Sequence, residues 1–439
     1  MPRIVFWKAV ATLVAASVLL GADWFERPPV EYTVSTPNNR LSKLEAEIGS
    51  QAIALRHEAK FGYLRDLLEE LEIAEDSQML VFSKTSLQRE RISPRTPRAL
   101  YFNDDSYVGY CQGGEVIEIA VTDSQLGAVF YTLDQSDAAS PKFTRQTHRC
   151  LQCHSSPATG EMPGYLVRSL FVGRSGMPLL SEGSHRVDHR TPIEDRWGGW
   201  YVSGTHGDQK HLGNLVVRDP NAPRPWTNDE GQNVTDLTDR FSTRKYLTPH
   251  SDIVALMVFE HQTHVHNLIS QANYAARQAL HDEKGLNEAL GESPSNRLGS
   301  TTRRIEGAGE RLLEGLLMVD EAPLTGPLVG VSSFAAEFTS RGPRDDKGRS
   351  LRDLDLKGRL FKYPCSYLIY SEAFDNLPAE MTAYLQSRMA EILVGRGGEK
   401  FAHLTPHDRE AIAAILAATK PGWLSIPIES EGTSTTPSS

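Results

Sequence analysis

The sequence predicts an α+β fold that is rich in helices and has an antiparallel β section in its first half. Three observations support this. Short β-branched and aromatic runs, separated by Asn, Asp, Gly and Pro, fill residues 79–133, as in strands joined by turns. After residue 251, apolar residues recur at three- and four-residue steps, as in amphipathic helices. With 439 residues, 39% of them hydrophobic, the chain can form one large domain or two ordinary ones.

The N-terminal segment, residues 1–25, has the layout of an export signal. Arg3 and Lys8 precede an apolar run over residues 9–20, which ends in small residues before an acidic one. A large residue stands three positions before a cut after Ala22, so a cleaved signal peptide and an uncleaved membrane anchor both remain open. No later run is apolar for long enough to cross a bilayer. We therefore expect an exported protein, in the periplasm or on the outer face of the inner membrane.

The body of the chain is expected to begin with one or two amphipathic helices over residues 41–71, which are rich in Leu, Glu, Arg and Lys. The antiparallel sheet or meander follows. Residues 160–250 have frequent Gly, Pro, His and Arg with weak periodicity, which indicates loops and short strands. Ser251 is the expected cap of a long helix that ends near Glu283. Further helices are predicted to cover residues 301–318 and 379–418.

These segments predict a division of the chain into parts. A mixed helix and β region is expected over residues 26–250, and a mainly helical region that packs on it over residues 251–425. The last part, residues 426–439, ends in SEGTSTTPSS, a composition typical of a disordered tail.

Residues 150–154 carry the strongest indication of chemistry. Cys150, Cys153 and His154 form the motif C-x-x-C-H, the attachment signature of c-type haem. Two thiols at this spacing can each add across a vinyl group of the haem, and the adjoining imidazole can bind the iron. Random placement would give this pentapeptide in roughly one chain per thousand. The motif predicts one covalently attached haem c, with His154 as the proximal iron ligand.

Three other interpretations of the two thiols remain open. They are a disulfide between Cys150 and Cys153, a redox dithiol, and half of a zinc site, for which His261 and His264 could supply the second ligand pair. A thioredoxin-like dithiol is expected after a strand, at the start of a helix in a βαβ unit. The flanking segments FTRQTHR and SSPATGEMPG do not have that pattern.

The motif resembles that of the c-type cytochromes. In small soluble cytochromes c it lies near the start of a helical domain of about 100 residues, and a Met far downstream is the sixth iron ligand. Here it lies a third of the way along the chain, occurs once, and no Met stands between Met177 and Met257. The resemblance therefore covers the pentapeptide and does not imply the small cytochrome c fold. Most of the chain also resembles an uncharacterised family of exported bacterial monohaem proteins, in the segments ALYFNDDSYVGYCQGG, RWGGWYVSGTHG and RLFKYPCSYLIYSEAFD.

The ligand on the other face of the iron decides between an electron carrier and an enzyme. His261 is the only strongly polar residue on an otherwise apolar line of the helix predicted after Ser251. It is a candidate distal ligand or acid–base residue, and a hydrogen-bonded core histidine is the alternative. Among thioethers, Met177 is favoured over Met162, which lies only eight residues past the motif.

A second candidate group occupies residues 185–211. It is dense in imidazole, guanidinium and indole groups, as a haem pocket or its mouth would be, although surface histidines and core tryptophans would give the same pattern. Gly198 and Gly199 within WGGWY would let the backbone pass close to a flat cofactor. The group comprises His185, Arg186, Asp188, His189, Arg190, Trp197, Trp200, Tyr201, His206 and His211.

Charge and the remaining cysteines add further expectations. The formal net charge of −10 argues against a nucleic-acid partner. Cys111 and Cys365 could join in a disulfide in an oxidising compartment, or remain two buried free thiols. A local arginine cluster forms either a solvated loop or a patch for haem propionates or an acidic electron-transfer partner. It comprises Arg89, Arg91, Arg95 and Arg98.

The leading hypothesis is an exported monohaem c-type cytochrome that passes single electrons to a redox partner protein or a small-molecule donor or acceptor. The alternative is a haem-dependent oxidoreductase, peroxidase- or oxidase-like, with an open distal site; the size of the chain favours it. A third reading is a haem-based sensor or assembly partner. Whether the chain is an enzyme, and its oligomeric state, stay open at this point.

Overall fold

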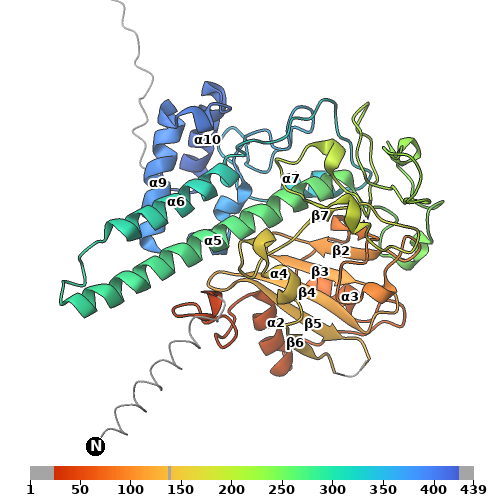
Figure 1. Cartoon of the computed structure of the whole chain (residues 1–439), viewed down its shortest axis with the longest axis horizontal. Helices are drawn as coiled ribbons and strands as arrows, with labels where there is room; N and C mark the ends of the chain where they lie inside the picture. The colour runs from red at the N-terminus through yellow and green to blue at the C-terminus, as the bar shows by residue number, and fades with distance from the viewer. Residues whose placement is uncertain (1–23, 137–139, 425–439) are drawn as a thin grey trace, which may run out of the picture.

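The structure is a computed structural model and describes residues 24–136 and 140–424 (Figure 1). The predicted signal peptide or anchor, apart from its last two residues, lies outside the described residues, and so does the predicted tail at 426–439. Within the described part, no helix is long and apolar enough to span a membrane.

The α+β fold expected from the sequence is confirmed, and its β section is an antiparallel sheet. Strands β1 to β6 form a meander, and β9 pairs with β1 to give the order β6-β5-β4-β3-β2-β1-β9. A second, two-stranded sheet consists of β7 (Arg168–Ser169) and β8 (His185–Arg186). The strands of the main sheet are β1 (Met79–Val81), β2 (Arg98–Phe102), β3 (Ser106–Tyr110), β4 (Val116–Asp123), β5 (Gly127–Asp134), β6 (Phe143–Arg145) and β9 (Trp200–Tyr201).

The helices lie close to the predicted segments. The segment 41–71 forms two short helices, and the segment 379–418 is divided by Gly395, whose positive φ of 85° interrupts the helix. The α-helices are α2 (Arg40–Gly49), α3 (Leu64–Glu70), α4 (Leu151–His154), α5 (Ile253–Leu290), α6 (Gly299–Leu316), α7 (Phe334–Ser340), α8 (Glu372–Asp375), α9 (Ala379–Glu391) and α10 (Pro406–Thr419).

The start of α5 differs from the prediction. Its N-cap is Asp252, not Ser251, because the Asp252 carboxylate accepts hydrogen bonds from the Val254 and Ala255 amides. The Ser251 hydroxyl instead donates to the carbonyl of Tyr201 at 2.6 Å and accepts from the Leu80 amide at 2.9 Å. It thereby joins the chain ahead of the helix to the edge of the sheet. The helix also continues beyond Glu283, to Leu290.

Helix α5 joins the two predicted regions of the chain through one apolar core. Figure 1 shows it lying along the sheet, with α6, α9 and α10 beyond it. Phe259 of α5 packs against Phe102 and Tyr107 of the sheet, with ring centroids 5.4 and 5.7 Å apart. The core continues from these residues to the C-terminal helices. The motif lies beside the same helix, so α5 is the element most able to position it.

Candidate haem-attachment site

The C-x-x-C-H motif forms a single helical turn, α4, shortly after β6. The amide of His154 donates to the carbonyl of Cys150 at 3.0 Å, so the three- and four-residue spacings place both thiols and the imidazole on neighbouring faces of one turn. Buried Leu151 anchors the turn in the core. Cys150 is half-buried, Cys153 is exposed, and both thiols are free.

The protonation of Cys150 distinguishes between the interpretations of the thiol pair. Burial raises its pKa to about 11, with Glu118 adding to the effect. A reactive redox dithiol needs a thiol whose pKa is lowered. The surroundings of Cys150 therefore do not favour the redox dithiol. They favour the protonated thiol, whose hydrogen is transferred to the vinyl group in a net addition.

His154 is held in one tautomer by a single hydrogen bond. Its Nδ1 lies 2.9 Å from the carbonyl oxygen of Gly164, which can only accept, so Nδ1 carries the proton. Desolvation lowers the pKa of the imidazole and favours its neutral form. Nε2 therefore presents a lone pair. A bond from the other ring nitrogen to a backbone carbonyl is the usual support of a metal-ligating histidine.

Helix α5 holds the loop that carries this carbonyl. Oδ1 of Asn267 accepts from the amide of Tyr165, and Nδ2 donates to the carbonyl of Tyr165, both at 2.7 Å. The Gly164 amide also returns to the His154 carbonyl at 2.8 Å. A Cβ on Gly164 would lie 2.6 Å from Oδ1 of Asn267, so only glycine fits against this clamp. The role of Asn267 could not be found from the sequence, because nothing in its spacing points to a partner 102 residues away.

The sheet face beneath the motif is partly open. The His154 ring lies 4.7 Å from that of Phe130 in β5, which pairs with Ala120 in β4 and therefore shares its face. Leu100 and Ala120 on this face are only partly buried, although β2 and β4 are interior strands. Partly buried apolar side chains beside two free thiols and an available imidazole nitrogen fit a flat, apolar prosthetic group such as haem.

An arginine–glutamate pair borders this open face. Arg98 of β2 donates to Glu118 of β4 at 2.6 Å, and both side chains are less than one-fifth exposed. Both charges act on the pKa of Cys150 and of His154, which places the pair beside the motif. Of the predicted arginine cluster, Arg98 therefore belongs to the site.

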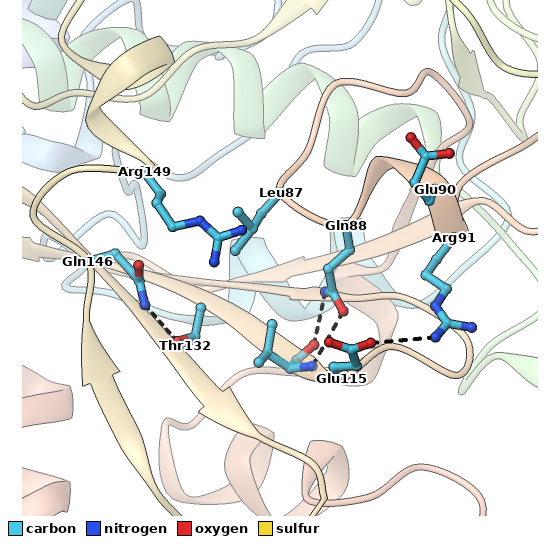
Figure 2. A pocket seen from close by; sticks show the side chains of 9 residues that line it. Leu87, Gln88, Glu90, Arg91, Glu115, Thr132, Gln146 and Arg149 are labelled. Atoms are coloured by element: carbon cyan, nitrogen blue, oxygen red, sulfur yellow. Dashed lines mark hydrogen bonds and ion pairs between the residues drawn. The ribbon is translucent and has the colours of Figure 1, made fainter.

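The pocket in Figure 2 extends from the motif along the ends of β4 and β5 and has a volume of about 260 Å³. Arg149, which immediately precedes Cys150, lines it at one end, and Arg91 lines it at the other. The segment before β2 supplies one wall through Leu87 and Gln88. A second member of the arginine cluster thus lies near the motif.

His261 is buried, as its position on the apolar line predicted, but its contacts are those of a core residue. Its Nε2 lies 2.8 Å from the Ser366 hydroxyl, and its ring contacts His189 and Phe361. His264 lies beside the same His189, with Nδ1 3.6 Å from Asp188. In the described part of the chain, no group of three or more His, Cys, Asp or Glu residues is arranged to hold a metal ion, the zinc ligand set included.

The group at residues 185–211 separates into several environments. His189 belongs to the cluster around His261. His206 and His211 meet edge to face with ring centroids 4.6 Å apart, and the Trp197 ring contacts His211. His185 is exposed. The two glycines of WGGWY pack against protein rather than leave room for a cofactor. A Cβ on Gly198 would lie 2.6 Å from the Leu170 carbonyl oxygen.

The thioether and disulfide candidates are also placed by the structure. Met177 is 55% exposed, whereas Met162 is buried in the loop beneath His154. Cys111 and Cys365 are both buried and free, so of the two alternatives the structure has the two buried thiols.

The structure thus brings together a half-buried thiol, an exposed thiol, an imidazole with an available Nε2, and a partly buried apolar sheet face. No family model, curated protein or solved structure matches this chain.

Proposed function

We propose that this chain is an exported monohaem c-type cytochrome that passes single electrons through one haem c. Cys150 and Cys153 would attach the haem, and His154 would bind its iron as the proximal ligand. The observation that carries the proposal is the hydrogen bond from Nδ1 of His154 to the Gly164 carbonyl, because it leaves Nε2 free for a metal. When bound, haem supplies a one-electron ferric–ferrous couple.

The thiols would form the attachment by addition. At each cysteine the S–H bond and the vinyl π bond break, and a C–S and a C–H bond form, so no electrons are gained or lost. Burial raises the pKa of Cys150, which favours the thiol whose S–H bond this net addition consumes. Exposed Cys153 is open to the reaction from solvent.

The position of the motif supports electron transfer rather than a closed interior site. Gln152 and Cys153 are both exposed, so a group attached here has an edge at the molecular surface. A redox partner protein or a small-molecule donor or acceptor could approach this edge directly. The clamp from Asn267 would keep the imidazole fixed while the charge of the site changes.

A haem-dependent oxidoreductase with an open distal site is a second candidate, and one observation favours it. His261, the histidine proposed as the distal ligand, already contacts Ser366, and the Met177 side chain is largely in solvent. Neither side chain is held ready for a second iron bond.

Haem staining of a denaturing gel tests the attachment. The chain would be produced in a periplasm that matures c-type cytochromes. We expect covalent haem in the wild type, its loss in the double variant C150A/C153A, and its retention in the control C111A/C365A, which also removes two thiols. Retention of covalent haem by C150A/C153A would refute the proposal.

The optical spectrum separates the two candidates. A low-spin spectrum that carbon monoxide does not alter indicates the electron carrier. A high-spin spectrum, or one that shifts with the gas, indicates the open-site oxidoreductase and rejects the simple carrier.

A further inference from the structure

The pocket beside Cys150 combines an apolar wall with polar groups, most of which are already paired. Leu87 and Val116 supply the apolar surface. The amide of Gln88 donates to the Val116 carbonyl at 2.9 Å, and that of Gln146 donates to the Thr132 hydroxyl at 2.9 Å (Figure 2). Gln88 also donates to Glu118 at 3.3 Å, so these bonds hold the walls in place and use both donors of the Gln88 amide and one donor of the Gln146 amide.

The charged groups of the lining are unequally paired. Glu115 lies 3.8 Å from Arg91, and Glu90 lies 3.4 Å from Arg89. Glu90 also lies 3.9 Å from Lys84. Arg149 makes no hydrogen bond or ion pair with any residue of the described part, and Figure 2 shows its guanidinium extended beside Leu87. Both carboxylates of the lining thus have cations, while this guanidinium has no anion.

We propose that this pocket binds a carboxylate, with Arg149 as the main cation and Arg91 as the second. A guanidinium offers several donors in one plane and binds carboxylates in a bidentate manner. The volume of about 260 Å³ is close to the lower limit of about 300 Å³ for small-molecule sites, so the ligand is a small one. The inference deepens the proposed function and rests on it for its place beside the haem edge.

Two sources could supply the carboxylate. One is a small organic acid from solution, which would bind next to the attached haem. The other is a propionate of the haem itself, which would be a permanent occupant. The charge chemistry is the same in both cases, so variants of the arginines test the pocket, and the probe distinguishes the sources.

The first experiment titrates the haem-loaded protein with succinate and follows binding by calorimetry. We expect binding that weakens about tenfold or more in R149Q, the loss of a charge-assisted contact, and less in R91Q. R95Q is the matched control, because Arg95 is an exposed arginine in the segment that follows Arg91 and does not line the pocket. Neutral succinamide should not bind.

The second experiment measures the midpoint potential of the haem between pH 5 and pH 9 without added ligand. If the occupant is a propionate, succinate does not bind, and R149Q or R91Q shifts the pH at which the potential changes, whereas R95Q does not. If succinate does not bind and neither variant differs from R95Q, the inference is wrong.

The failure of the proposed function is recognised separately. A chain that carries no covalent haem on a stained gel refutes the cytochrome proposal. The succinate titration of that haem-free chain, with R149Q and R95Q, then tests the pocket by itself.

Discussion

Nδ1 of His154 lies 2.9 Å from the carbonyl oxygen of Gly164. This contact spans ten residues, and Asn267 of α5 fixes its far end by bonding both backbone groups of the next residue, Tyr165. The orientation of the imidazole therefore depends on a helix that lies more than 100 residues away in the sequence. Two predictions test this dependence.

The substitution N267A should lower stability and change the iron site. It leaves the amide and carbonyl of buried Tyr165 unpaired, and each such group costs about 1–3 kcal/mol. Urea unfolding measures the loss. A looser Gly164 carbonyl also makes His154 a weaker donor to iron, so the midpoint potential should rise. Q271A is the control, since Gln271 packs against Gly160 of the same loop and donates a long, 3.4 Å hydrogen bond to the Thr159 carbonyl. Equal effects of both variants would contradict the clamp.

The substitution G164A should destabilise the fold through a steric clash with the Asn267 side chain, and N267A should remove this clash. The added methyl group would lie 2.6 Å from Oδ1 of Asn267, and overpacking of this kind costs about 1–3 kcal/mol. In the N267A background the cost of G164A should be much smaller, so a double-mutant cycle should show coupling. G285A, on the open surface of α5, should instead raise stability by up to about 1 kcal/mol. Additive effects of G164A and N267A would count against the steric explanation.

The order of the elements was predictable because it depends on local pattern. Alternating and aromatic runs identified the meander, and apolar steps identified α5, although not its cap. Ser251 and Asp252 are both good capping residues. Asp252 caps the helix because the Ser251 hydroxyl donates a hydrogen bond to the carbonyl of Tyr201 instead. Tyr201 lies 50 residues away, so no local pattern reveals this contact.

The site was predictable only as far as the motif extends. Cys150, Cys153 and His154 are adjacent in the sequence, so their spacing alone indicates their chemistry. Asn267 and Gly164 meet through folding, and an asparagine on a helix has no distinctive spacing. The same reason applies to Gly198. Glycine is needed there because the backbone of Leu170, which folding brings next to it, leaves no room for a Cβ.

The buried ion pair between Arg196 and Glu260 should be sensitive to the loss of one partner. Its atoms are 2.9 Å apart, and the two side chains are 2% and 1% exposed. Burial raises the pKa of Glu260 to about 7, so the pair is tested at pH 8.5, where Glu260 is ionised. There, E260A would leave the Arg196 charge uncompensated, which costs about 3–5 kcal/mol in chemical unfolding. The double variant R196M/E260L should recover much of this loss, because it removes both charges. R304A breaks an exposed pair with Asp282 and should cost at most about 1 kcal/mol. Similar losses of stability in E260A and R304A would show that burial does not increase the cost of removing one partner of an ion pair.

Acid should destabilise the fold before its carboxylates are fully protonated. Burial lowers the pKa of His189 to about 4 and that of His211, His264 and His266 to about 3. Below the usual histidine pKa of 6.5, the unfolded chain therefore binds protons that the folded chain does not. Each such histidine lowers the free energy of unfolding by about 1.4 kcal/mol per pH unit as the pH falls from about 6 towards 4.

Two buried carboxyl groups act in the opposite direction over the same range. Burial raises the pKa of Glu260 and Glu321, so the folded chain keeps protons on them that the unfolded chain releases above pH 4.5. The pKa values of His154, His206, His250 and His261 are lowered as well, and that of Asp105 is raised. The histidines therefore outnumber the carboxyl groups, and the free energy of unfolding should fall as the pH falls. Urea unfolding at pH values from 7 to 5 measures this change in the free energy of unfolding. H264Q should reduce its slope by about 1.4 kcal/mol per pH unit, the contribution of one histidine. Stability that stays constant or increases towards pH 5 would mean that these histidines already carry protons in the folded chain.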